Sequence, residues 1–305
     1  MNHFATIITM DHLDKALALL TSLQQFGETE LHIYIVDLTM QPQKLDHPGL
    51  IIHTQQELLT EPINKIILTK YVGHESDGQI QLPLKGIISF YDYLRWALKP
   101  SFIQMLHKEY ERVIYCDCDL YFYNDYKFLT DMLDDNRIVI SPHWREISPV
   151  ANTDYKYNFM HGLYNGGFFA TRDADDFLQW WTEMCAIECS AESSNGTYVD
   201  QKYLDVVPLY FDGVSIIRHS GCNVAGWNIH YLKRESSNHQ ILINGQPIVF
   251  IHFSPVTINK IESGEDYLLQ GHMQEYDKKL MDIRVNLTRR GLKSCISLKE
   301  EADVI

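Results

Sequence analysis

The N-terminal third of the chain alternates between strand-like and helix-like segments, and this alternation limits the fold more than any other feature. Phe4–Met10 is apolar and rich in β-branched residues, and leucines then recur at helical spacing between residues 13 and 23. Leu31–Val36 returns to a strand-like pattern. A strand, a helix and a second strand in this order form a right-handed parallel crossover. The sequence therefore predicts an α/β protein with a mainly parallel sheet.

The same pattern continues along the rest of the chain. Apolar residues recur every three or four positions from Ile87 to His107, and Pro100 is expected to divide this stretch into two helices. Further strands are predicted at Arg112–Tyr115, Asn165–Thr171 and Ile248–Phe253, a helix at Asp173–Cys189, and loops at residues 72–86 and 141–162. We expect one domain over residues 1–260 and a helical C-terminal extension over residues 261–305.

The balance of charge limits which partners the protein can have. The chain has 305 residues, with 26 Lys and Arg against 40 Asp and Glu, so its formal net charge is −14 at pH 7. Such an acidic chain is disfavoured as a nucleic-acid binder. No apolar run reaches the ~18 residues of a membrane-spanning helix, and the first residues lack the pattern of a signal peptide. We therefore expect a cytoplasmic protein.

Two aspartates follow a predicted core strand in the segment RVIYCDCDLYFYND. Asp117 and Asp119 are two residues apart, so their side chains point the same way from an extended chain. They leave the end of a parallel strand, where ligands of open α/β sheets bind. Two carboxylates, completed by water and phosphate, describe a Mg²⁺ or Mn²⁺ site that holds a nucleotide diphosphate. The alternative is a strand-terminal turn with solvated acids, because D-x-D alone is a weak pattern.

Seven short segments follow one another between about residues 4 and 255: ATIITMD, SFYDYLRW, RVIYCDCDLYFYND, GLYNGGFFATR, VDQKYL, NVAGWN and IHFSP. Their order and spacing resemble family 8 glycosyltransferases and their bacterial relatives. The resemblance implies a GT-A fold, a Rossmann-like sheet flanked by helices. It also implies metal-dependent transfer of a sugar, with retention at the anomeric carbon, from a nucleotide donor to the hydroxyl of a carbohydrate or glycolipid acceptor. A UDP-linked donor is expected.

The resemblance assigns roles residue by residue. It assigns metal binding to Asp117, Asp119 and His252, and an imidazole beside two carboxylates favours Mn²⁺ over Mg²⁺. It assigns the catalytic positions, which orient the donor sugar at the reacting face, to Asp200 and Gln201. The positions that it assigns to donor binding are Thr9, Asp11, Arg95, Asp117, Cys118, Asn165, Gly166, Gly167 and Asn223.

Aromatic side chains in two loop regions are candidates for acceptor binding. They are His143, Trp144, Tyr155 and Trp227, with Tyr157 and Tyr231 beside them in the sequence. Packing within a lid is the alternative for these residues. Simpler alternatives also exist for His252, as a core histidine on a strand, and for Asp200, as the N-cap of a helix over residues 201–207.

The family pattern is not complete. Its late motif H-x-x-G-x-x-K-P-W is represented by His252-Phe-Ser-Pro-Val-Thr-Ile258, so Pro255 replaces the glycine and Ile258 the lysine. The sequence leaves open which cation replaces that lysine; Lys260, Arg218 and Lys233 are the candidates.

Two other functions remain open at the level of sequence. A nucleotidyltransferase would carry a phosphate-binding loop rich in Gly and Lys after the first strand, and ATIITMDHLDKA has none. A non-catalytic protein that binds sugars or nucleotide sugars would keep the aromatic residues and lose metal dependence. For the C-terminal extension, a solvated helix and a weak peripheral contact with the inner membrane face are both open.

Overall fold

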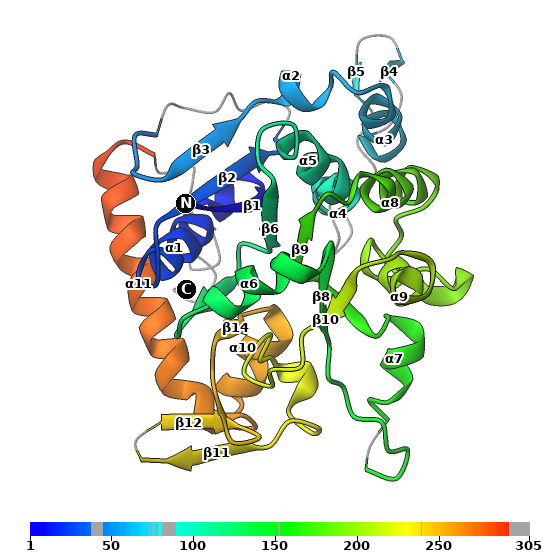
Figure 1. Cartoon of the computed structure of the whole chain (residues 1–305). Helices are drawn as coiled ribbons and strands as arrows, with labels where there is room; N and C mark the ends of the chain where they lie inside the picture. Colours follow the sequence, from blue (N-terminus) through cyan, green and yellow to red (C-terminus); the bar gives the residue numbers. More distant parts are fainter. Residues whose placement is uncertain are drawn as a thin grey trace.

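The centre of the molecule is a seven-stranded sheet, and the computed structural model describes residues 1–37, 45–72, 75–76, 79–80, 90–151, 153–238 and 240–292. The strands lie in the order β10-β8-β9-β6-β1-β2-β3 (Figure 1). They are β1 (Asn2–Ile8), β2 (Thr29–Ile35), β3 (Leu50–His53), β6 (Arg112–Cys116), β8 (Ile138–Pro142), β9 (Tyr164–Arg172) and β10 (Val214–Ile216). Neighbours are parallel except where β9 pairs with β6 and β8. The predicted α/β class with a mixed, mainly parallel sheet is confirmed.

Helices cover both faces of this sheet. On one face α1 (Leu13–Gln24) and α11 (Gln270–Arg289) lie side by side, and on the other lie α4 (Phe90–Ala97), α5 (Lys99–Leu106) and α8 (Asp175–Ile187) (Figure 1). Each face has its own core of buried side chains. The four leucines that predicted α1 all lie in the first of these cores, because their spacing places them on one side of the helix.

Shorter elements fill the connections. They are α2 (Gln55–Leu58), α3 (Pro62–Val72), β4 (Glu75–Ser76), β5 (Gln79–Ile80), α6 (Lys127–Asp135), α7 (Lys156–Met160), α9 (Val207–Tyr210), α10 (Pro255–Glu262) and the β-strands β11 (Arg234–Ser237), β12 (Gln240–Ile243) and β13 (Gln246–Pro247). Short 3₁₀ helices span Met10–His12, Ser193–Asn195, Gln201–Val206, Gly226–Asn228 and Tyr267–Leu269.

A two-stranded antiparallel pair lies at the carboxyl end of β6. It joins β7 (Leu120–Phe122), directly after the D-x-D segment, to β14 (Phe250–His252), near the end of the chain. The rings of Phe122 and Phe250 are opposite one another, with centroids 4.9 Å apart. Burial of these apolar residues thus brings a distant histidine beside the acidic segment.

The break between α4 and α5 lies at Leu98 rather than at Pro100. Pro100 occupies the first turn of α5, where its missing N–H removes no helical hydrogen bond. The predicted loop at residues 141–162 contains the short helix α7. Most of residues 73–89, which include the glycine-rich loop and the start of the helical stretch at Ile87, lie outside the described residues.

The described part of the C-terminal region is helical, as predicted, and packs on the rest of the molecule. The guanidinium of Arg284 donates to the carboxylate of Asp14 on α1 at 2.7 Å, and Asp14 is fully buried. Leu287 enters the same core as α1. The domain boundary at residue 260 stays a prediction, and residues 293–305 lie outside the described part.

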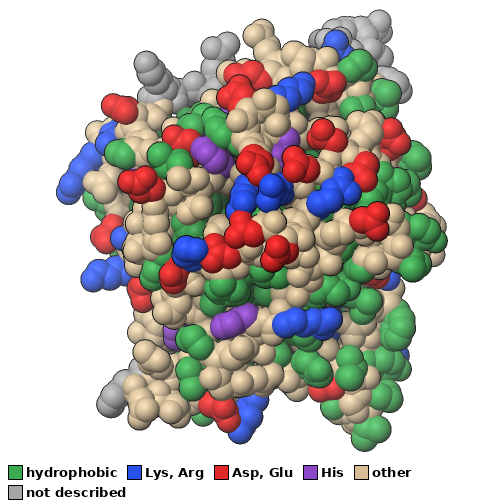
Figure 2. Space-filling view, in the orientation of Figure 1, with side chains coloured by type: hydrophobic (Ala, Val, Ile, Leu, Met, Phe, Trp, Pro, Cys, Tyr) green, Lys and Arg blue, Asp and Glu red, His purple; other side chains and the backbone are tan. Residues whose placement is uncertain are grey.

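The surface carries charges of both signs. Figure 2 shows acidic and basic side chains interspersed across one face of the molecule, with hydrophobic side chains gathered along its right and lower right edges. Among the described residues, no helix is long and apolar enough to cross a membrane.

Candidate active site

Three metal-ligand side chains meet at the carboxyl end of β6. The Asp117 amide donates to the Gly167 carbonyl of β9, and a tight turn from Asp117 to Leu120 then presents both aspartates. The pairing of β14 with β7 places His252 opposite Leu120. The Nε2 atom of His252 lies 3.1 Å from Asp119 Oδ1, and ligand atoms of the two aspartates and the histidine all lie within 4.8 Å of one another.

The residues at this point fit a divalent cation. A Cβ atom at Gly167 would lie 2.7 Å from Asp117 Oδ2 and 2.7 Å from His252 Cε1, so the glycine leaves this space free. Asp117, Asp119 and the nearby Asp200 bring three negative charges, and the buried Lys99 returns one positive charge. Carboxylates and imidazole are both ligand types that divalent metal ions take in proteins.

Asp119 and His252 stabilise one another's charged forms. Burial alone raises the pKa of Asp119, but the charge and hydrogen bond of His252 outweigh burial and lower it. Burial likewise lowers the pKa of His252, and the two aspartates more than offset this effect and raise it. The Nδ1 atom of His252 is buried and has no hydrogen-bond partner among the described residues.

Lys99 is a site residue that the sequence did not reveal. Its side chain comes from the first turn of α5 and is 2 % exposed. Its Nζ atom lies 3.2 Å from Asp117 Oδ1 and 3.2 Å from Asp200 Oδ2, and it donates to the Gly166 carbonyl at 3.0 Å. Lys99 therefore links the D-x-D segment to Asp200. The only available signal was a lysine flanked by apolar residues in WALKPS, at the junction of two helices.

Asp200 faces the site and does not cap the helix that follows it. Its side chain makes no capping hydrogen bond to the 3₁₀ helix Gln201–Val206, so the N-cap alternative is wrong. Burial raises the pKa of Asp200 to about 6, with Lys99 opposing this shift and Asp117 adding to it. The residue before it, Val199, has a φ of 43°, which is strained for a β-branched side chain. The strained backbone at Val199 thus helps to set the position of the Asp200 side chain.

One side of the site is formed by the segment Asn165, Gly166 and Gly167. A Cβ atom at Gly166 would lie 2.7 Å from Asp200 Oδ2, so only glycine fits there. The side-chain amide of Asn165 donates to His143 Nε2 at 3.2 Å and accepts from the Gly167 amide at 3.1 Å. Gln201 Nε2 donates to the His161 carbonyl at 3.1 Å. The predicted donor-sugar and catalytic residues therefore share one hydrogen-bonded layer.

A first cavity, of about 350 Å³, opens on the side of β1 and α4. We call it the donor cavity. Its lining is Ile7, Asp11, His12, Lys15, Arg95, Trp96, Lys99, Asp117, Cys118, Asp119 and Pro255. It contains the predicted Asp11, Arg95 and Cys118, and Thr9 supports it through a 2.8 Å hydrogen bond to His12 Nδ1. Lys15, which the sequence analysis missed, adds a further cation to this cavity.

A second cavity, of about 440 Å³, lies on the other side of the three ligands. We call it the acceptor cavity. Its lining is His143, Arg145, Asp154, Tyr157, His161, Asn165, Tyr198, Gln201, Gly226, Trp227, Ser254, Val256 and Lys260. The ring of Trp227 packs edge-on against both His143 and His252, with centroids 5.6 and 5.0 Å away. The site thus lies beside two cavities.

Among the described residues, twelve buried side-chain polar atoms lack a hydrogen-bond partner, and five of them belong to predicted site residues. These five are Arg95 Nε, Asp200 Oδ2, Asn223 Oδ1, Trp227 Nε1 and His252 Nδ1. Most buried polar atoms in folded proteins are hydrogen-bonded, so these exceptions call for an explanation. A polar ligand in the two cavities would supply partners for those that line them. Asn223 also donates to the Pro142 carbonyl at 3.2 Å and so holds the end of β8.

Two of the residues predicted to bind the acceptor sugar, Trp144 and Tyr155, are not part of the described lining of the acceptor cavity. Trp144 stacks on Tyr231, with ring centroids 6.1 Å apart, and Arg218 lies over its indole. Tyr155 precedes α7. Of the cations considered as replacements for the family lysine, Lys233 pairs with Glu235 and Lys260 with Glu265.

Comparisons with known proteins were made by sequence and by structure. No family model matches the sequence. Two relatives from Bacillus subtilis (strain 168) are similar over most of their length. The uncharacterized protein YfnF is 27 % identical over 270 residues, which cover 85 % of this chain and 84 % of YfnF. The uncharacterized protein YfnD is 25 % identical over 261 residues, which cover 84 % of this chain and 78 % of YfnD.

Two solved structures of glycosyltransferases overlap with the fold of this chain. Mouse xyloside xylosyltransferase 1 in its apo form overlaps with a TM-score of 0.49 at 14 % identity, covering 84 % of this chain and 98 % of that chain. The galactosyltransferase LgtC, in complex with donor and acceptor sugar analogs, overlaps with a TM-score of 0.46 at 16 % identity, covering 84 % and 88 %. At these sequence identities and TM-scores, the two structures assign no chemistry to the residues of this chain.

Proposed function

We propose that this protein is a metal-dependent glycosyltransferase that moves a sugar from a nucleotide donor, UDP-linked, to the hydroxyl of a carbohydrate or glycolipid acceptor. The observation that carries the proposal is the position of Asp117, Asp119 and His252 beside two cavities, one lined by both aspartates and one lined by Gln201 and Trp227. Transfer between two substrates needs two binding spaces that share a charged centre, and a binding protein needs only one. The sequence motifs and the retention of configuration that they imply support the same assignment.

In the proposed mechanism, Asp117, Asp119 and His252 hold Mn²⁺ or Mg²⁺. When bound, the cation supplies positive charge against the leaving diphosphate. Lys15 and Arg95 line the donor cavity and are placed to meet the same diphosphate, with the guanidinium of Arg95 also held by an ion pair with Asp92. They take the place that the sequence analysis left open for the missing family lysine.

Asp200 orients the donor sugar in this proposal. Its Oδ2 atom has no hydrogen-bond partner beyond the 3.2 Å ion pair with Lys99, and it lies beside Gly166, where the backbone can approach a ligand closely. It can therefore accept a hydrogen bond from a sugar hydroxyl. Gln201 lines the acceptor cavity and stays fixed by its bond to the His161 carbonyl, so its role is to shape the reacting face.

The acceptor cavity has the side chains to bind a sugar. The indole of Trp227 offers an apolar face and an unpartnered N–H, and Arg145 contributes a guanidinium that is 8 % exposed. Exposed apolar side chains continue outward from this cavity along the chain: Ile147, Val150, Phe159, Met160 and Leu163. This apolar rim favours a glycolipid acceptor over a free sugar.

The decisive experiment is hydrolysis or transfer from UDP-sugars with added Mn²⁺. Asp119→Asn is expected to reduce turnover by at least about a hundredfold, because a metal ligand is lost without a change in side-chain volume. Asp212→Asn, at an exposed acid after α9, is the matched control and is expected to retain activity. Metal-independent turnover, or turnover that Asp119→Asn leaves unchanged, would contradict the proposal. Release of pyrophosphate from a nucleoside triphosphate would instead identify a nucleotidyltransferase.

A further inference from the structure

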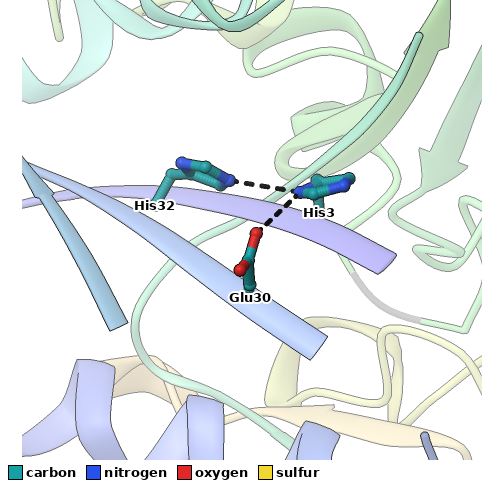
Figure 3. A group of neighbouring side chains, drawn as sticks. All are labelled: His3, Glu30 and His32. Atoms are coloured by element: carbon teal, nitrogen blue, oxygen red, sulfur yellow. Dashed lines mark hydrogen bonds and ion pairs between the residues drawn. The ribbon is translucent and has the colours of Figure 1, made fainter. Parts of the chain in front are cut away.

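A second group of metal-ligand side chains lies at the opposite end of the sheet. His3 is at the start of β1, and Glu30 and His32 are at the start of β2, where His3 is paired in register with Glu30. Figure 3 shows the three side chains pointing toward one another from the two strands. The candidate active site lies beyond the carboxyl end of β6, so neither cavity described above includes these residues.

We propose that His3, Glu30 and His32 form a site for a divalent transition metal ion, with zinc as the preferred ion. Two imidazoles and one carboxylate match the ligand types that zinc takes in proteins. Nitrogen donors also favour Zn²⁺ over Mg²⁺ and Ca²⁺, which prefer oxygen. The site is separate from the proposed sugar-transfer site and does not depend on that function.

Two distances in the group are close to those between ligand atoms of a tetrahedral metal site, and all three ligand atoms lie within 4.8 Å of one another. His3 Nδ1 lies 3.4 Å from His32 Nε2 and 3.3 Å from Glu30 Oε2. Ligand atoms bound tetrahedrally at about 2.0–2.1 Å from zinc are about 3.3 Å apart. Hydrogen bonds from nitrogen are shorter, about 2.7–3.2 Å. The neighbouring contacts of His53, at 3.0 Å to His32 and 2.9 Å to Glu57, lie in that shorter range.

The hydrogen bonds between His32 and His53 and between His53 and Glu57 determine which nitrogen of His32 is free. The Glu57 carboxylate is an acceptor only, so His53 donates its Nδ1–H to Glu57 and accepts at Nε2 from the Nδ1–H of His32. The lone pair of His32 Nε2 then faces His3 and Glu30. Ligating histidines in proteins are oriented by the same kind of hydrogen bond to the other ring nitrogen.

The surroundings keep both imidazoles available. Tyr110 stacks on His3 with ring centroids 4.0 Å apart and packs beside His32 at 4.7 Å, which holds both rings in place. An adjacent cavity of about 600 Å³ is lined by His3, Tyr110 and Arg112, so the group is open to solvent on the side of His3.

The test measures Zn²⁺ bound to the full chain in an Asp117→Asn/Asp119→Asn background, which removes the first metal site. Chelator-stripped protein is dialysed against ZnCl₂, and bound zinc is counted per chain. We expect one zinc ion. His3→Gln and Glu30→Gln are each expected to weaken its binding at least about tenfold. His47→Gln, a histidine outside both groups, is the matched control and is expected to bind zinc as the parent does.

Two further readouts keep the outcome clear. Co²⁺ bound by the parent is expected to show the strong visible absorption of four-coordinate cobalt, and the His3→Gln variant is expected to lose it. Zinc is also expected to raise the melting temperature of the parent and not of the variants, because a ligand that binds only the folded state stabilises it. Absence of zinc binding in the parent, or equal zinc binding in His3→Gln and Glu30→Gln, would overturn the proposal.

Discussion

At the scale of single residues, Lys99 decides how the candidate active site is held. Burial alone would lower its pKa, but the carboxylates of Asp117 and Asp200 outweigh burial and raise it. The ammonium therefore stays charged at neutral pH and keeps the half-buried Asp117 and the buried Asp200 from repelling one another. Loss of one partner from a buried ion pair leaves an uncompensated charge, and this costs more than the pair itself contributes.

Replacement of this lysine tests that role. Lys99→Met is expected to lower the free energy of unfolding by about 3–5 kcal/mol at pH 8, because Asp117 and Asp200 lose their buried counter-charge. The loss is expected to be smaller at pH 5, where Asp200 is protonated. Denaturant unfolding followed by fluorescence measures both values. Lys108→Met, which breaks an exposed ion pair with Glu61, is the control and is expected to cost less than about 1 kcal/mol. Equal losses in the two variants would contradict this role for Lys99.

Gly167 offers a second test at this scale. In Gly167→Ala the new Cβ atom would lie 2.7 Å from side-chain atoms of Asp117, Asn165 and His252, so at least one of them has to move. We expect Mn²⁺ affinity, measured by titration calorimetry, to fall at least about tenfold. Gly271→Ala is the control, because a Cβ atom there meets open space on α11, and it is expected to leave Mn²⁺ affinity unchanged. Unchanged affinity in Gly167→Ala would place the metal elsewhere.

Site residues that are close together in the sequence could be predicted, and those that are far apart could not. Asp117 and Asp119 could be predicted as a pair because they are two residues apart after a core strand, although a turn rather than the expected extended chain brings them together. His252 was assigned only through a resemblance, because its approach to Asp119 depends on the pairing of β14 with β7. Lys99 could not be found at all, since its contacts to Asp117 and Asp200 arise from the packing of α5 against the sheet.

At the scale of elements, the segment from β8 to β9 connects the acceptor cavity to an apolar surface. Tyr157 on α7 lines the cavity, whereas Val150 and Phe159 on the same segment are 91 % and 74 % exposed. Exposed apolar groups gathered beside a binding cavity are typical of an interaction surface. The sequence predicted a binding loop here from its length and aromatic content, and the helix α7 within it was missed because its five residues show no helical periodicity.

Polar substitutions on this segment test the glycolipid proposal. The double variant Val150→Ser/Phe159→Ser is expected to lower turnover of a lipid-linked acceptor at least about fivefold, because apolar contact area for the lipid is lost. Its hydrolysis of UDP-sugar in the absence of acceptor is expected to match the parent enzyme. Met281→Ser, at an exposed apolar position on α11, is the control. An equal effect of Val150→Ser/Phe159→Ser on both reactions would contradict a role in acceptor binding.

At the scale of the whole molecule, the α/β class and the mainly parallel sheet were predictable because β1, β2, β6 and β9 each have a strong local pattern, whereas the strands β8 and β10 were not predicted. The sheet order was not, since the antiparallel insertion of β9 between β6 and β8 depends on which strand edges remain free after β1, β2 and β6 have paired. This insertion matters for the site. It places Gly167 beside the end of β6. The residues predicted to bind the donor sugar, at positions 165–167, therefore lie close to the predicted metal ligands.

Buried neutral histidines are distributed over the same molecule and set its response to acid. Burial is the main cause that lowers the pKa of His32 to about 3 and that of His161 to about 4, and it also lowers the pKa of His143 and His107. These side chains bind protons near pH 6.5 only when the chain unfolds. Their contribution to stability is therefore complete above pH 6.5 and is lost as the pH falls toward the folded-state values. Asp200 acts in the opposite direction, since its raised pKa adds stability as the pH falls from 6 to 4.

We expect the histidines to prevail, so the melting temperature of chelator-treated protein falls between pH 7 and pH 5. Each histidine that stays neutral in the folded state contributes up to about 2 kcal/mol to this loss. His143 is the clearest case, because its Nδ1–H donates to the Gly162 carbonyl and its Nε2 accepts from Asn165, which leaves no place for a second proton. In His143→Gln this proton-binding difference disappears, so the fall in melting temperature is expected to be shallower. A melting temperature that rises toward pH 5 would show instead that Asp200 and His252 dominate.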